Sequence, residues 1–156
     1  MRLLEQLLDV VPGTSARGRR VAHAGDWYFQ GHFPGDPVVP AIVLMELLAQ
    51  TGGCAAVQPG RGHAHALRVA AFAAFKFPGA ARPGATLEAR ARVVGRMGGM
   101  VKIEGDVTAD GVTVATGGVT LAEVYLGGRG GRGAGDLGGG DLGGSGGSEE
   151  AGGSRT

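Results

Sequence analysis

Apolar and polar residues alternate along the part of the chain that precedes its glycine-rich end. Residues 86–95 place Leu, Ala, Ala and Val at every second position, and residues 100–108 repeat the alternation. A Gly-Gly pair at 98–99 separates these two runs, and an Asp-Gly pair at 110–111 leads into a third, residues 112–125. Successive side chains of a strand point to opposite faces, and such dipeptides favour tight turns. The pattern therefore predicts antiparallel hairpins with one solvated face.

The remaining strand signals are weaker. Residues 3–11 fit either a strand or a helix, and we favour a strand that turns through Pro12-Gly13 into a second strand, residues 19–24. Residues 67–77 are a further strand candidate, which the pair Pro78-Gly79 ends. Together with the alternating runs, these segments predict five or six antiparallel strands.

Residues 41–57 have a helical pattern instead. Apolar residues occupy nearly the whole circumference of this segment, and only Glu46 and Gln50 are strongly polar. Pro40 stands where a first-turn proline belongs, and Gly52-Gly53 loosens the far end. A helix that is apolar nearly all round is a buried helix. We therefore predict an α+β fold in which an antiparallel sheet wraps around a long central helix.

Composition divides the chain in two and excludes several classes of protein. About half of residues 127–156 are glycine, so we predict one domain at residues 1–126 and a disordered tail at 127–156. A formal net charge of +1 is not that of a nucleic-acid-binding protein. The longest apolar stretch, residues 38–48, is too short and too interrupted to cross a membrane. A single cysteine and an N-terminus without secretory features favour the cytoplasm.

Residues 31–50 carry the side chains best suited to chemistry. His32 lies in a loop that prolines and a glycine make rigid, and Glu46 lies among the leucines of the predicted helix. The free amides at the start of that helix favour negative charge. A lone loop histidine is ordinarily a surface residue, and a lone helical glutamate is often structural. Together they provide a base, an anion-stabilising helix end and a buried carboxyl group, which suits removal of a proton beside a carbonyl and loss of a β-substituent.

The order of residues in this segment matches a known pattern. His-Phe-Pro-Gly-x-Pro begins at His32, Val-x-Pro follows, and Glu46 comes fourteen residues after the histidine and four before Gln50. Phe-Lys-x-Pro at residues 75–78 precedes Pro-Gly at residues 83–84. In these motifs the chain resembles the β-hydroxyacyl-acyl carrier protein dehydratases of bacterial fatty acid synthesis, over about residues 27–125.

The resemblance implies a hot-dog fold, a homodimer or a trimer of dimers, and an active site at the dimer interface. His32 of one subunit would remove the α-proton of a (3R)-hydroxyacyl thioester, and Glu46 of the other would help the β-hydroxyl leave as water, giving a trans-2-enoyl thioester. The substrate would arrive on the phosphopantetheine arm of acyl carrier protein, and neither a metal nor a cofactor is implied. The resemblance assigns thioester binding to Ala41 and Gly35. The residues that it implies along the acyl tunnel are Phe33, Pro40, Gln50 and Phe75.

Two departures from the family pattern affect the substrate and the reaction. Ala41 stands where the family has glycine, and its methyl group would crowd the thioester. Gly35 and the residues after it are closer to the branch that also isomerises the double bond, but that branch has Asp at the position of Glu46, so we favour dehydration alone. A hot-dog acyl thioesterase and a non-catalytic acyl-binding domain remain the alternatives.

Other reactive residue types have ordinary structural explanations. His63 and His65 are expected in a solvated turn rather than a metal site, and Cys54 is expected to be a small buried residue of the helix. A basic cluster could bind an acidic carrier protein, although a solvated surface is the ordinary interpretation, and an aromatic run before His32 is expected to pack. The cluster comprises Arg17, Arg19 and Arg20; the run comprises Trp27, Tyr28 and Phe29.

Overall fold

A computed structural model describes residues 1–60 and 65–126 of the chain. It contains six strands, one α-helix and one short 3-10 helix among these residues. The predicted tail at 127–156 and His63 lie outside the described residues, and no helix within them is long and apolar enough to cross a membrane. The elements in chain order are β1 (Gln6–Val11), β2 (Ser15–Val21), η1 (Trp27–Phe29), α1 (Ala41–Ala56), β3 (His65–Lys76), β4 (Thr86–Met97), β5 (Met100–Ala109) and β6 (Val112–Tyr125).

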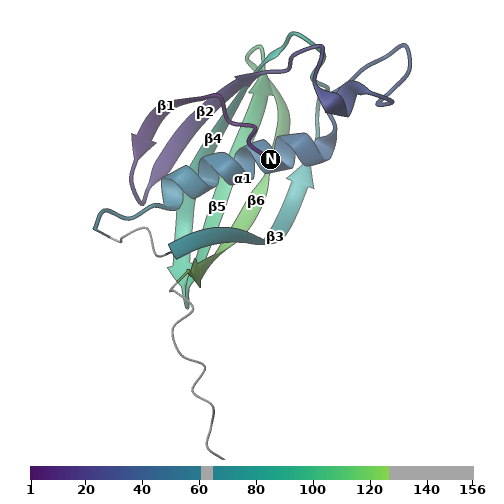
Figure 1. Cartoon of the computed structure of the whole chain (residues 1–156). Coiled ribbons are helices and arrows are strands. Elements are labelled where there is room, and N and C mark those ends of the chain that lie inside the picture. The colour runs from purple at the N-terminus through teal and green to yellow at the C-terminus, as the bar shows by residue number, and fades with distance from the viewer. Residues whose placement is uncertain (61–64, 127–156) are drawn as a thin grey trace, which may run out of the picture.

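The strands form a single antiparallel sheet in the order β1-β2-β4-β5-β6-β3. The sheet curls around α1, which lies across its concave face (Figure 1). This is the predicted arrangement of a sheet wrapped around a central helix. The Gly-Gly turn at 98–99 joins β4 to β5 and the Asp-Gly turn at 110–111 joins β5 to β6, so the three alternating runs pair as expected.

The N-terminal hairpin also forms, but with different limits from those predicted. The first strand is confirmed as β1, whereas β2 starts at Ser15, four residues before the predicted start, and ends at Val21. Small residues, Ala16 and Gly18, take the helix-facing positions of β2, and they made the strand pattern hard to see in the sequence. A Cβ atom at Gly18 would lie 2.2 Å from the Cδ1 atom of Leu4 and 2.7 Å from the Oγ1 atom of Thr51, so a larger residue there would have to displace these side chains.

The core lies between α1 and the helix-facing side of the sheet. Alternate residues of β4 and β5 supply one wall, and Leu47 and Leu48 of α1, both 0% exposed, supply the other. Each buried leucine of this kind contributes roughly 2–5 kcal/mol to stability, as judged from the usual cost of truncating one to alanine. The buried sheet residues include Leu87, Ala89, Ala91, Val101, Ile103 and Val107.

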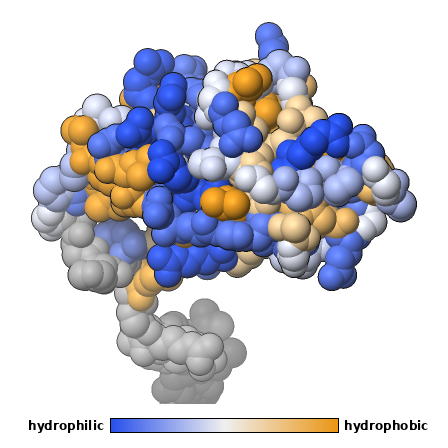
Figure 2. Space-filling view, turned by 90° about the horizontal axis from the view of Figure 1, so that it is seen from above, coloured by the Kyte–Doolittle hydropathy of each residue, from blue (hydrophilic) through white to orange (hydrophobic). Residues whose placement is uncertain are grey.

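Among residues 1–60 and 65–126, two surfaces are left without cover. One side of α1 is open, since Ile42 is 70% exposed and Met45 and Cys54 are only partly buried, so the prediction of a helix buried all round is wrong. The edge strand β3 is also exposed along most of its length, including Val69 and Phe72. The reason is geometric: one curled sheet covers one side of the helix. Seen from above, the surface is largely hydrophilic with separate apolar patches (Figure 2).

Candidate active site

The predicted base, His32, lies in a loop that the backbone holds in place. The loop follows η1, and the His32 amide donates to the Phe29 carbonyl at 3.4 Å while the His32 carbonyl accepts from the Val38 amide at 2.9 Å. The imidazole stacks on the ring of Phe33, with centroids 4.3 Å apart. His32 is partly exposed, so its ring is available to a reactant.

Gly35 has a structural reason to be glycine. Its φ of +79° is in the left-handed region, at the tip of a turn in which Phe33 and Asp36 exchange backbone hydrogen bonds of 3.2 and 3.3 Å. Arg82 donates to the carboxylate of Asp36, which ties this turn to the segment between β3 and β4. The role of Gly35 in thioester binding remains a prediction.

The helix start predicted to bind the thioester carbonyl is open to solvent. Pro40 precedes α1, and its carbonyl accepts from the amides of Val43 and Leu44 at 3.0 and 3.4 Å. The first amides of a helix have no intrahelical acceptor and carry its positive dipole end. Ala41 is exposed at this end, and the role of its amide in polarising a carbonyl oxygen remains a prediction.

Glu46 is partly exposed in the single chain, which corrects the prediction of a buried carboxyl group. It lies on the open side of α1, and its Oε1 atom accepts a hydrogen bond of 3.0 Å from the side-chain amide of Gln50, one turn later. Gln50 also holds the N-terminal chain: its Oε1 atom accepts from the amides of Leu3 and Leu4 at 2.9 and 3.2 Å, and its Nε2 atom donates to the carbonyl of Met1 at 2.9 Å.

The two predicted catalytic residues do not meet in one chain. Within the described residues, His32 and Glu46 share neither a hydrogen bond nor an ion pair. His32 belongs to the loop before α1, whereas Glu46 lies in the second turn of that helix. In the described part of one subunit, therefore, no hydrogen bond or ion pair joins the base to the carboxyl group.

A cleft of about 540 Å³ lies beside Gln50, between the N-terminal chain, the open side of α1 and the start of β3. Much of its lining is apolar, and α1 contributes residues that follow Glu46 at helical spacing. A larger depression of about 840 Å³ lies on the opposite side of the sheet and is lined by charged residues, but neither His32 nor Glu46 borders it. The apolar lining of the smaller cleft consists of Leu4, Leu7, Gly53, Cys54, Val57 and Leu67.

The other predicted tunnel residues are spread over several surfaces. Phe33 is 55% exposed on the loop, whereas Phe75 packs against the core and stacks on Phe77 with centroids 5.9 Å apart. Gly117 faces Phe75, and a Cβ atom there would lie 2.5 Å from the ring. The tunnel itself stays a prediction for Phe33, Pro40 and Phe75.

A buried ionic cluster behind the loop was missed in the sequence. Arg20, 7% exposed, donates from Nη2 to Asp26 Oδ2 at 2.6 Å, so its assignment to a solvated basic surface is wrong. The same carboxylate oxygen accepts from the hydroxyl of Tyr28 at 2.6 Å and from the amide of His23 at 3.0 Å. Alternate residues of a strand share a face, so the spacing of Arg20 from Ala16 and Gly18 along β2 was the sequence signal that could have placed Arg20 on the helix-facing side.

These contacts shift two pKa values. Burial alone would raise the pKa of Asp26, but the hydrogen bond from Tyr28 and the adjacent charge of Arg20 hold that pKa below its usual value. The pKa of Tyr28 is raised, because burial disfavours the phenolate and its hydroxyl donates to Asp26. The pair is therefore a carboxylate and a neutral phenol at neutral pH.

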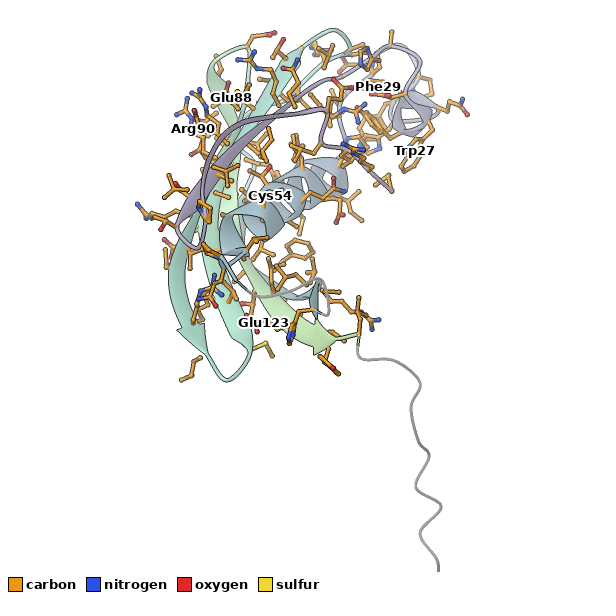
Figure 3. The ribbon with its side chains drawn as sticks, turned by 60° about the vertical axis from the view of Figure 1, so that its left-hand side comes forward. Trp27, Phe29, Cys54, Glu88, Arg90 and Glu123 are labelled. Carbon is orange, nitrogen blue, oxygen red and sulfur yellow. The ribbon has the colours of Figure 1, made fainter. Side chains whose placement is uncertain are left out.

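The other candidate residues have structural surroundings. Arg17 pairs with Asp9 at 2.9 Å and Arg19 with Glu88 at 3.2 Å, on the side of the sheet away from α1, where Figure 3 shows Glu88 and Arg90. Tyr28 is buried as predicted for the aromatic run, although Trp27 is 60% exposed. Burial raises the pKa of the Cys54 thiol, which opposes a nucleophilic role. The His65 ring contacts Tyr125 edge-on at 5.4 Å.

Known proteins match this chain over most of its described length. A family model for the FabA-like domain matches residues 1–118, a range that contains every residue of the candidate site. The chain belongs to the FabA-like family. A 3-hydroxyacyl-[acyl-carrier-protein] dehydratase FabZ of a Roseiflexus species is 32% identical over 77% of this chain and 84% of its own length. A FabZ of Chloroflexus aggregans is 39% identical over 54% of this chain and 59% of its own length.

Solved structures of similar shape confirm the hot-dog fold for this member of the FabA-like family. The dehydratase heterocomplex ApeI:P from Xenorhabdus doucetiae aligns with a TM-score of 0.62 at 16% identity, over 80% of this chain and 84% of its own. A thioesterase superfamily member of Thermus thermophilus, TTHA0967, aligns with a TM-score of 0.63 at 15% identity, over 76% and 86%. Dehydratases and thioesterases thus share this fold, so the activity of a FabA-like protein must be argued from its site.

Proposed function

We propose that this chain is a 3-hydroxyacyl-[acyl-carrier-protein] dehydratase, which converts (3R)-hydroxyacyl thioesters carried on acyl carrier protein to trans-2-enoyl thioesters. The observation that carries the proposal is the pair His32 and Glu46, at the family spacing, on a backbone-fixed loop and an open helix face. FabZ dehydratases are among the relatives that match the chain in sequence, and dehydration is a reaction that a base and a carboxyl group can perform. The reaction belongs to fatty acid synthesis or related acyl or polyketide synthesis in the cytoplasm.

The chemistry divides between the two side chains. His32 removes the α-proton, and the C–H electrons form the double bond to the β-carbon as the C–O bond to the hydroxyl breaks. Glu46 gives its proton to the departing hydroxyl, which leaves as water. The amide of Ala41, at the positive end of α1, stabilises the negative charge that develops on the thioester oxygen. Acid–base chemistry of this kind requires neither a metal nor a redox cofactor.

Two subunits complete the site in this proposal. His32 and Glu46 are separate in one chain, while the edge of β3 and the open side of α1 expose apolar residues such as Val69 and Ile42. Pairing of two β3 edges would cover both surfaces and bring His32 of one subunit to Glu46 of the other. A trimer of such dimers is the larger assembly that the family suggests.

The acyl chain is assigned to the cleft beside Gln50. The cleft starts one helical turn beyond Glu46 on the same side of α1 and is lined by apolar residues. Gln50 would then lie between the reacting carbons and the rest of the acyl chain, with its amide committed to Glu46 and the N-terminal backbone. The phosphopantetheine arm would enter from the loop side, near Phe33.

The test measures two quantities in one reaction: the mass of the acyl thioester and the amount of free thiol released from it. Wild-type protein incubated with a β-hydroxybutyryl carrier-protein thioester should form a product lighter by one water, and His32→Ala and Glu46→Gln should each abolish it. Glu104→Gln is the matched control, because Glu104 is 63% exposed and pairs only loosely with Arg92 at 3.7 Å. Release of free thiol without loss of water would instead establish the thioesterase. Neither reaction, from a folded dimer, would favour the acyl-binding domain.

A further inference from the structure

Arg20 is an unusual residue for its position in the sheet. It is the last helix-facing residue of β2, and its side chain is only 8% exposed. A buried guanidinium costs free energy unless its donors find acceptors and its charge finds a partner. All three of its nitrogens bind: Nε donates to the Val21 carbonyl at 3.1 Å, Nη1 to the Leu3 carbonyl at 3.2 Å, and Nη2 to Asp26 at 2.6 Å.

One end of this arrangement leads to the carboxyl group of the site. The Leu3 residue that receives Nη1 through its carbonyl donates through its amide to Gln50 Oε1 at 2.9 Å. Gln50 in turn donates to Glu46 Oε1 at 3.0 Å. The N-terminal chain is thus held between Arg20 and Gln50, and the N-terminus lies against α1 (Figure 1). Gln50 therefore fixes one carboxyl oxygen of Glu46.

The other end leads to the loop of the base. Asp26 receives Arg20 and also the hydroxyl of Tyr28, which belongs to η1. The guanidinium carbon of Arg20 also lies 6.0 Å from the centroid of the Tyr28 ring. The next residue of η1, Phe29, receives the His32 amide. Trp27 and Phe29 lie together at the end of the molecule where α1 begins (Figure 3).

We propose that Arg20 is a positioning residue for both catalytic groups, which it connects through Leu3 and Gln50 to Glu46 and through Asp26 and Tyr28 to the loop of His32. The inference rests on the proposed function and deepens it. The guanidinium of Arg20 thus holds two segments of one subunit, and in the proposed dimer these segments contribute to two different active sites. Lysine cannot replace Arg20, because an ammonium group cannot donate in two separate directions from one rigid plane as a guanidinium group does.

The decisive variant is Arg20→Lys, which keeps the charge. Its matched control is Arg19→Lys, the same change one residue earlier, on the opposite face of β2, where Arg19 is 41% exposed beside Glu88. A pantetheine thioester of β-hydroxybutyrate is the substrate, so that any contact with carrier protein does not enter. We expect Arg20→Lys to lower kcat by roughly ten- to a hundred-fold, the usual cost of a small misplacement, with KM within about two-fold of wild type. Arg19→Lys should leave both constants unchanged.

Two further measurements separate positioning from simple loss of structure. Combined with Glu46→Gln, Arg20→Lys should lower the remaining rate by a smaller factor than it lowers the wild-type rate, because the part of its effect that passes through Glu46 is already lost and only the part through His32 is left. The milder Tyr28→Phe, which removes only one donor to Asp26, should lower kcat by a few-fold and serves if Arg20→Lys does not fold. A wild-type kcat in Arg20→Lys, or additive losses in the double variant, would overturn the inference.

A readout without turnover keeps the two proposals distinguishable. In NMR spectra of the folded dimer, Arg20→Lys should shift the side-chain amide signals of Gln50 and the ring signals of His32, and Arg19→Lys should shift neither. Unchanged Gln50 and His32 signals in Arg20→Lys would contradict the positioning role whatever the activity. If the wild-type protein is inactive but Arg20→Lys still shifts these signals, the dehydratase is contradicted while the connection through Arg20 stands.

Discussion

Arginine side chains differ in burial and in partners between the two faces of the sheet. On the helix-facing side, Arg20 is buried and binds two backbone carbonyls and Asp26. On the outer side, Arg17 and Arg19 share the carboxylate of Glu88, and each remains about 40% exposed. Among the described residues, the Nε atoms of these two arginines have no hydrogen-bond partner. Adjacent arginines of one strand thus make a connected buried cluster on one face and loose surface pairs on the other.

Burial decides how much each arrangement contributes. Exposed ion pairs gain little because solvent screens them and the side chains lose freedom on pairing. A buried pair is costly to break, because the remaining charge stays desolvated without its partner. The helix-facing side is therefore where a polar residue can fix geometry, and the outer side is where substitutions are tolerated.

The largest expected difference comes from removing the guanidinium on each face. Arg20→Met should lower the free energy of unfolding by about 3 kcal/mol, because it leaves Asp26, whose side chain is only 17% exposed, without its cation. Arg19→Met should lower it by less than about 1 kcal/mol. Urea denaturation of the two variants measures both values. Equal, small losses would show that the buried cluster contributes no more than a surface pair.

A smaller difference is expected for added methyl groups at two glycines. A Cβ atom at Gly105 would lie 2.0 Å from the Arg90 carbonyl oxygen and 2.6 Å from Leu48, whereas nothing lies within 4 Å at Gly95. Gly105→Ala should therefore destabilise the protein by roughly 1–3 kcal/mol. Gly95→Ala, also in a strand, should be neutral or slightly stabilising. Thermal melting of both variants tests this, and an unchanged melting temperature for Gly105→Ala would mean that the sheet yields at this position.

The smallest effects are expected at the extremes of pH. The pKa of Asp26 is lowered in the folded state, so its contribution is complete above the unfolded value near 4 and is lost as pH falls through the folded pKa. The pKa of Tyr28 is raised, so its contribution is complete below about pH 10 and is lost as pH rises above it. Compared with wild type, Asp26→Asn should flatten the acid limb of a stability–pH curve, and Tyr28→Phe the alkaline limb.

Controls for this pH experiment lie on the outer face. Glu104→Gln removes a carboxylate that is 63% exposed, and the acid limb should keep its wild-type slope in that variant. Identical acid limbs for Asp26→Asn and wild type would show that the hydrogen bonds around Asp26 do not distinguish its folded from its unfolded state.

Strand positions with strong alternation were predicted well, and those with small or charged residues were not. β4, β5 and β6 start at the predicted residues because their apolar positions are separated by glycine-containing turns. β2 was misplaced because its helix-facing residues are Ala16, Gly18 and Arg20, which carry no apolar signal. His32 and Glu46 were identified from spacing, but the open side of α1 and the exposure of Glu46 depend on how much of the helix one sheet can cover.

The sequence by itself determined the hairpins, the central helix, the family and the candidate catalytic pair, because each depends on residues that are near one another in the chain or on a motif of fixed spacing. Only the tertiary structure decided that Leu3, Arg20, Asp26 and Gln50 form one connected set. These residues come from the N-terminal chain, β2, the segment before η1, and α1. Hydrogen bonds between such distant segments form because the sheet curls around the helix. That curl depends on packing between elements, so it cannot be predicted from neighbouring residues in the sequence.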